Sequence, residues 1–150
     1  MVNPVAMLVR YANNNPEKIT YELALEAVKL HGGVLEKVPH SLKTEELCLE
    51  AVKNCCVAMK HVPGNLCTEE IGMFGIMQQA FVFDYIPEEC KTHKLSLMAF
   101  KLGASITSMP RFAYCEELWL DLIKESGTAY RHSPFTGGEH ERLHKLLYLV

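Results

Sequence analysis

Two stretches decide the fold: TYELALEAVKLHGGVLEKVP at residues 20–39 and TEELCLEAVKNCCVAMKHVP at residues 44–63. Three more align with them: TEEIGMFGIMQQAFVFDYIP from residue 68, THKLSLMAFKLGASITSMP from residue 92, and CEELWLDLIKESGTAYRHSP from residue 115. The prolines that close the five stretches are spaced by 24, 24, 23 and 24 residues; they are Pro39, Pro63, Pro87, Pro110 and Pro134. A fixed period of this length is typical of helical repeat proteins, in which each repeat is one small helical unit.

Each unit is expected to begin with an α-helix of about 11 residues. In the first unit Thr20 stands at the N-cap position, where its hydroxyl oxygen can accept a hydrogen bond from an orphan amide. Leu23, Ala27 and Leu30 then fall on one helical face, joined by Val28, and this spacing predicts the buried side of the helix.

The end of that helix is predicted from glycines. Gly32 and Gly33 in the first unit, and Gly103 in the fourth, can adopt the left-handed conformation that ends helices. A short second helix is expected at residues 34–38, and Pro39 then prevents the chain from continuing as helix.

The predicted fold is therefore all-α: an α-solenoid of about five 24-residue helix-turn-helix repeats with capping helices at both ends. A unit this small cannot bury its apolar face alone, so neighbouring units must stack. We expect a single domain at residues 1–150. It divides into an N-terminal cap at 1–17 with a helix over 5–12, repeats at 18–137, and a C-terminal capping helix at 138–150.

Composition excludes several classes of function. The formal net charge is −3, whereas nucleic-acid-binding domains usually carry a clear basic excess. No apolar run is long enough to span a bilayer, and the first ten residues lack the features of a signal peptide. We therefore expect a cytoplasmic protein with reduced cysteines that binds neither membranes nor nucleic acid.

The units resemble the repeat family known as domain of unknown function 4116. The resemblance is carried by LALEAVK (residues 23–29) and LCLEAVK (47–53), followed by VLEKVP (34–39) and AMKHVP (58–63). It covers about residues 18–135, closely in the first two units and more loosely afterwards. It implies small helical repeats in proteins of host-associated microbes, and hence an effector delivered into a host cell. It implies no reaction.

One short motif matches a zinc-protease pattern. His140, Glu141 and His144 form H-E-x-x-H, in which two histidines one turn apart bind zinc and the glutamate activates water. Arg142 places a cation beside the metal position, and residues 145–150 supply no third ligand. We therefore assign no catalytic residue, no metal and no cofactor, and keep a zinc-dependent hydrolase as an alternative.

One repeat position holds lysine in four of the five units. These residues are Lys29, Lys53, Lys101 and Lys124. Stacking would align them in a stripe that could attract an acidic partner. The alternative is pairing with the acidic residue three positions earlier, as in Glu50 with Lys53.

The strongest indication of a binding site is where the repeat departs from its own pattern. Phe74 and Met98 replace the glutamates of the first two units, and Met77 replaces a lysine. Consecutive units stack, so these three side chains are expected to form an apolar cluster on a face that should be polar. Such a cluster marks a protein-binding site, unless local packing buries it.

The resulting prediction is a non-enzymatic protein-binding module. Its partner is expected to be another protein, contacted through Phe74, Met77, Met98, Lys29, Lys53 and Lys101. Besides the zinc hydrolase, the alternative is a structural protein that self-associates, as a homodimer, through the same cluster.

Overall fold

The computed structural model describes residues 3–109 and 116–126, together with the single residues 129, 131, 138 and 145. Over these residues the chain is helical and contains no strand, which confirms the all-α prediction. The α-helices are α1 (Pro4–Asn14), α2 (Tyr21–Leu30), α3 (Glu45–Asn54), α4 (Glu69–Gln78), α5 (His93–Lys101) and α6 (Glu116–Glu125). The 3-10 helices are η1 (Pro16–Lys18), η2 (Gly32–Lys37), η3 (His40–Leu42), η4 (Cys56–His61), η5 (Gly64–Leu66), η6 (Ala80–Tyr85), η7 (Glu88–Cys90) and η8 (Ile106–Ser108).

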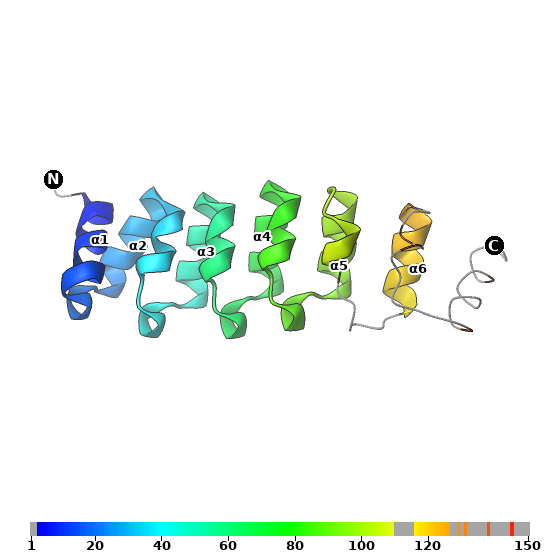
Figure 1. The fold of residues 1–150 in the computed structure, drawn as a ribbon. Coiled ribbons are helices and arrows are strands. Elements are labelled where there is room, and N and C mark those ends of the chain that lie inside the picture. Colours follow the sequence, from blue (N-terminus) through cyan, green and yellow to red (C-terminus); the bar gives the residue numbers. More distant parts are fainter. Residues whose placement is uncertain are drawn as a thin grey trace.

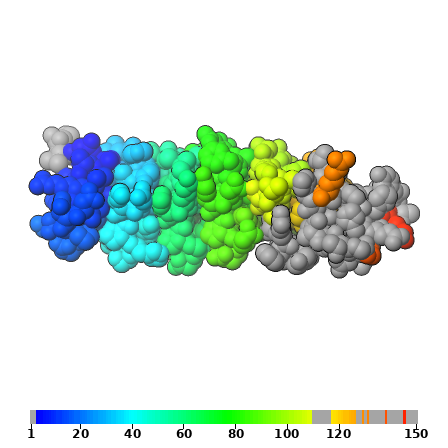
Figure 2. All heavy atoms as spheres, in the orientation of Figure 1, coloured from blue at the N-terminus to red at the C-terminus, as the bar shows by residue number. Residues whose placement is uncertain are grey.

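The α-helices stand side by side in chain order, and the described part of the molecule is elongated (Figures 1 and 2). Each α-helix packs against the next one along the row, from α1 to α6. The longer 3-10 helices form a second layer, in which η2 contacts η4 and η4 contacts η6. An α-helix such as α3 touches both its own 3-10 helix, η4, and the preceding one, η2. The core is therefore continuous along the row.

Threonine N-caps begin four of these helices, as the sequence indicates. The hydroxyl oxygens of Thr20, Thr44, Thr68 and Thr92 accept hydrogen bonds from the backbone amide three residues later, at 3.3, 3.2, 3.4 and 3.2 Å. Each bond satisfies one of the amides that a helix start leaves without a partner inside the helix.

The ends of the helices differ from the prediction in the first unit. Gly103 has φ +96° and is the residue with positive φ within the described part of the chain, so the prediction holds for the fourth unit. In the first unit α2 ends instead at His31, which is extended at φ −152°. Gly32 is required for a different reason: a Cβ there would lie 2.1 Å from the carbonyl oxygen of Ala51 on α3. The glycine permits close packing between units.

The segment after the first helix also differs from the prediction. It folds as a 3-10 helix over Gly32–Lys37, and Val38, predicted as helical, is extended. This follows from Pro39, because the residue before a proline is pushed away from the helical region. A further 3-10 helix, His40–Leu42, follows the proline and was not predicted.

The buried face of α2 is shifted from the predicted one. Ala24, Ala27 and Val28 are fully buried, Leu23 is half-buried, and Leu30 is 63% exposed. The buried residues follow the i, i+3, i+4 spacing from Ala24, and Leu30 falls outside that stripe.

Two lysines join neighbouring units in the same way. Lys43 and Lys91 hold one repeat position, two units apart. The Lys43 ammonium donates to the carbonyl oxygen of His61 at 2.8 Å, and that of Lys91 donates to the carbonyl oxygen of Ser108 at 3.2 Å. Lys91 is buried and also pairs with Glu88 at 2.6 Å. Burial lowers the pKa of Lys43 from its usual value.

Candidate partner-binding site

A shallow apolar hollow lies along the outer face of α5, beside the end of α4. Its volume is about 470 Å³, and nearly all the surface that lines it is apolar. The lining residues are Met77 from α4, Lys94, Leu97, Met98 and Lys101 from α5, and Leu102 directly after it. We call this feature the α4–α5 hollow. A concave surface that is apolar and exposed is unusual on an isolated domain and typical of a binding site.

Two of these side chains are strongly exposed. Met77 is 66% exposed and Leu102 is 51% exposed. Leu97 and Met98 form the floor, because both are half-buried and pack against the core. The hollow thus has a half-buried apolar floor and an exposed apolar wall, and the methionine side chains on both can adapt their shape.

The neighbouring surface between α3 and α4 is built differently. There the Lys53 ammonium lies 5.2 Å from the centre of the Phe74 ring, a cation–π contact, and also pairs with Glu50 at 3.2 Å. Phe74 is 37% exposed. Of the predicted cluster of three residues, Met77 and Met98 line the same hollow, and Phe74 contacts the Lys53 ammonium. Whether any of the three contacts a partner stays a prediction.

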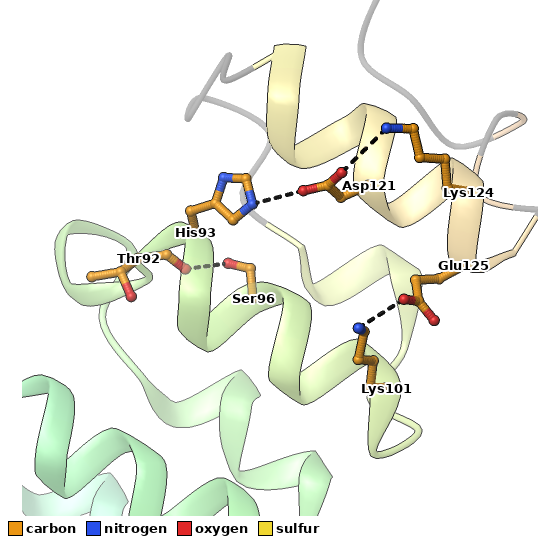
Figure 3. Close-up of polar contacts among 7 residues, drawn as sticks. All are labelled: Thr92, His93, Ser96, Lys101, Asp121, Lys124 and Glu125. Atoms are coloured by element: carbon orange, nitrogen blue, oxygen red, sulfur yellow. Dashed lines mark hydrogen bonds and ion pairs between the residues drawn. The ribbon is translucent and has the colours of Figure 1, made fainter. Parts of the chain in front are cut away.

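Polar contacts connect α5 to α6 at both ends of α5 (Figure 3). At its start, the His93 imidazole Nε2 lies 3.3 Å from a carboxylate oxygen of Asp121. At its end, Lys101 pairs with Glu125 at 2.7 Å. On the other side of α5, Lys94 pairs with Glu69 of α4 at 2.6 Å.

The lysine stripe is therefore partly neutralised by carboxylates. The predicted pairing three residues apart is present for Lys53 with Glu50, and for Lys124 with Asp121 at 3.7 Å. Lys101 instead pairs with the following helix, and Lys29 is exposed on α2. These exposed pairs contribute little energy, so a partner's carboxylate could exchange with them.

Three residues of the hollow were missed from the sequence: Lys94, Leu97 and Leu102. A signal existed for Lys94, because its repeat position holds a glutamate in the other four units, as Glu22, Glu46, Glu70 and Glu117. Leu97 and Leu102 carry no such signal, because leucine also stands at their repeat positions in other units, for example Leu49 and Leu30. Only the packing of α4 against α5 brings these two residues to the surface of the hollow.

Two cysteines, Cys48 and Cys67, are poorly suited to thiolate chemistry. Burial raises the pKa of Cys48 to about 11. Burial, with the neighbouring Cys90 thiol, raises the pKa of Cys67 to about 12. A nucleophilic cysteine needs the opposite shift. Both side chains pack in or against the hydrophobic core, where a thiol acts as a small apolar group.

The H-E-x-x-H motif, His140, Glu141 and His144, lies outside the described residues, as do most residues of the predicted C-terminal helix at 138–150. Within the described part, no group of three histidine, cysteine or acidic side chains is arranged to hold a metal ion. None of the described helices combines the length and the apolar character needed to cross a membrane. The zinc hypothesis stays untested.

Comparison with known proteins gives one match. A family model described as domain of unknown function (DUF4116) matches residues 20–67, which span the first two units. No curated protein matches the chain, and no solved structure matches it.

Proposed function

We propose, on the premise that residues 20–67 place this chain in the domain of unknown function 4116 family, that it is an α-solenoid which binds another protein through the α4–α5 hollow. In this proposal about five 24-residue units form the body, residues 1–17 cap the N-terminal end and residues 138–150 cap the C-terminal end. The binding function requires no reaction, cofactor or metal.

The repeated contacts between units support the solenoid. The same threonine cap begins α2, α3, α4 and α5. The same lysine-to-carbonyl bond joins units at Lys43 and at Lys91. Repetition of contacts at equivalent positions is how a solenoid builds its stability from nearest-neighbour interfaces.

The observation that carries the binding function is the change in surface chemistry at α4 and α5. At the α3–α4 surface two repeat positions hold Lys53, from α3, and Phe74, from α4, and the Lys53 ammonium lies 5.2 Å from the centre of the Phe74 ring. One unit later the equivalent positions are Met77 and Met98, and they line an apolar hollow. If a partner covers the exposed Met77 and Leu102, their apolar surface is removed from water, and this burial would stabilise the complex.

Site-specific photo-crosslinking tests this proposal. Benzoylphenylalanine would replace Met77 in one variant and Leu30 in another. Leu30 is a matched control because it is equally exposed, at 63% against 66%, but lies on α2. The variants would be illuminated in the native cells, and crosslinked species identified by mass spectrometry.

We expect one protein to crosslink from position 77 and not from position 30. Crosslinking to a second copy of the chain would instead support the self-association alternative. Equal crosslinking from both positions, or none from position 77, would contradict a binding site at the hollow. An effector role, with delivery into a host cell, rests on family analogy and would follow only if the crosslinked protein came from the host.

A further inference from the structure

The surfaces between successive α-helices can be compared at equivalent positions of the repeat. Between α3 and α4, Lys53 covers the Phe74 ring. Between α5 and α6, Lys101 reaches Glu125. Between α4 and α5 the same level holds Met77 and Met98, and the hollow opens there. The hollow thus opens where Met77 replaces the lysine that the neighbouring surfaces hold at this position, as Lys53 and Lys101.

The two methionines favour a particular kind of guest. A thioether is polarisable and adapts its shape, and sulfur contacts with the edge of an aromatic ring are favourable. Aromatic side chains are also the commonest anchors in protein interfaces. The gap between Met77 and Met98 is therefore suited to an aromatic side chain inserted from outside.

The charges of the hollow are all of one sign. Its charged lining residues are Lys94 and Lys101, both on α5. They are seven residues apart, which on an α-helix is about 10.5 Å, or two turns. Both are exposed, at 64% and 50% of their side chains, and each has one surface carboxylate as its partner. A guest with carboxylates two turns apart could exchange with those carboxylates at little cost.

The shape of the surface selects a helix as the guest. The hollow runs along α5 beside the end of α4, and the described residues offer no strand edge to which an extended peptide could add. An amphipathic helix that lays its apolar face in a groove between helices is an established mode of peptide recognition.

We infer that the occupant of the α4–α5 hollow is a short amphipathic helix of the partner protein. It inserts an aromatic anchor between Met77 and Met98 and places acidic residues against Lys94 and Lys101. The inference rests on the proposed function and adds the chemistry of the partner to it.

A displayed peptide library tests the inference without knowledge of the partner. The peptides would be helices of about four turns, with one apolar face and with randomised residues at the anchor and at two flanking positions two turns apart. The bait is the full chain. A Met77→Lys/Met98→Glu variant serves for counter-selection, because lysine and glutamate are the residues that the second unit holds at these positions, as Lys53 and Glu50.

We expect selection to enrich aromatic anchors and acidic flanks. The selected peptides should bind the Met77→Lys/Met98→Glu variant at least about tenfold more weakly than the natural chain. A Lys94→Glu/Lys101→Glu variant should lose binding to the acidic peptides and gain binding to the same peptides with lysine flanks. This exchange of charge would not occur if the substitutions merely damaged the fold.

Three results would overturn the inference: no enrichment, enrichment of basic or non-aromatic peptides, or equal binding to the Met77→Lys/Met98→Glu variant. The last result would show that the peptides bind elsewhere. If a partner crosslinks from position 77 but acidic, aromatic helices are not selected, the proposed function stands and the inference about the occupant falls. Formation of dimers by the chain alone, measured by sedimentation, would assign the hollow to a second copy and would also overturn it.

Discussion

The side chain of Asn54, at the end of α3, reaches back to the end of α2 and donates from Nδ2 to the carbonyl oxygen of Lys29 at 3.0 Å. Its Oδ1 accepts a hydrogen bond from the amide of Gly32 at 2.7 Å. One unit later, Gln78 donates to the carbonyl oxygens of Val52 and Lys53 at 2.8 and 3.1 Å. The last carbonyls of a helix have no partner inside it, so the second and third units each satisfy carbonyls of the preceding one.

Replacement of Asn54 by leucine, the residue at this repeat position in the first and fourth units, should destabilise the chain. Two polar groups of the backbone lose their partner, at a cost of about 1–3 kcal/mol in the free energy of unfolding. Urea unfolding followed by circular dichroism measures this. Asn65→Leu, on the exposed surface of η5, is the control and should change the free energy by less than about 0.5 kcal/mol. Equal effects of the two substitutions would contradict the role of Asn54.

Alanine at three glycines should have three different effects. Gly32→Ala should destabilise by about 1–3 kcal/mol or more, because its Cβ would meet the Ala51 carbonyl at 2.1 Å. Gly103→Ala has open space but φ +96°, so it should cost about 1–2 kcal/mol in backbone strain. Gly33→Ala meets only the His31 ring, at 3.4 Å, and should be neutral or stabilise by up to about 1 kcal/mol. Thermal unfolding of the three variants gives the order of their stabilities. A Gly33→Ala variant that is less stable than Gly32→Ala would contradict the predicted order.

Removal of a threonine cap should weaken the helix that it begins. Thr92→Ala takes away the oxygen that accepts from the Leu95 amide at 3.2 Å, and should cost about 1 kcal/mol. Thr92→Ser keeps that oxygen and should restore most of the stability. Hydrogen exchange of the first amides of α5, measured by NMR, should accelerate in the alanine variant alone. Acceleration in both variants would show that the methyl group, and not the cap, matters.

The helices and their order could be predicted from the sequence because the signals are local. A threonine cap such as Thr20 and a proline such as Pro39 act on the few residues beside them. The features that were predicted wrongly, the role of Gly32 and the burial of Leu30, depend instead on contacts between units. A glycine is required at position 32 because the backbone of α3 lies close to it. Leu30 is exposed because α3 covers a different face of α2. Both causes lie in the next unit, so the sequence of one repeat does not reveal them.

The candidate site was also only partly predictable. Met77 and Met98 are recognisable because they depart from the pattern of their repeat position. The contact of Phe74 with Lys53 was not predictable, because it depends on the reach of Lys53 from the preceding helix. Lys94 also departs from its repeat position, which holds a glutamate in the other units, whereas Leu97 and Leu102 carry no sequence signal. Only the packing of α5 beside α4 turns these two leucines toward the hollow.

Alkaline pH should destabilise the chain through two buried thiols. The pKa of Cys48 is raised from 9.0 to about 11, and that of Cys67 from 9.0 to about 12. The stability from these protonated thiols is fully present below pH 9, and it is lost as the pH rises through about 11 to 12, because unfolded thiols ionise first. Burial also lowers the pKa of Lys43 from its ordinary value of 10.5. Below pH 10.5 this shift has the opposite effect, because it makes the free energy of unfolding rise with pH.

Urea unfolding at pH 8, 9 and 10 checks this linkage. The free energy of unfolding should fall above pH 9, and a Cys48→Ala/Cys67→Ala variant should show a smaller fall, although it is less stable at pH 8. An identical pH dependence of the variant and the natural chain would exclude the thiols as its cause.

If the apolar α4–α5 hollow binds a partner protein, substitutions in it should weaken that binding, and substitutions elsewhere should not. Affinity toward the protein that crosslinks from position 77 would be measured for the natural chain, the Met77→Lys/Met98→Glu variant and a Leu30→Asn variant. Both variants place residues that other units already hold at these positions, so their circular dichroism should match the natural chain. We predict that affinity falls at least about tenfold for the first variant and is unchanged for the second. Equal affinity of all three chains would contradict binding of the partner at the hollow.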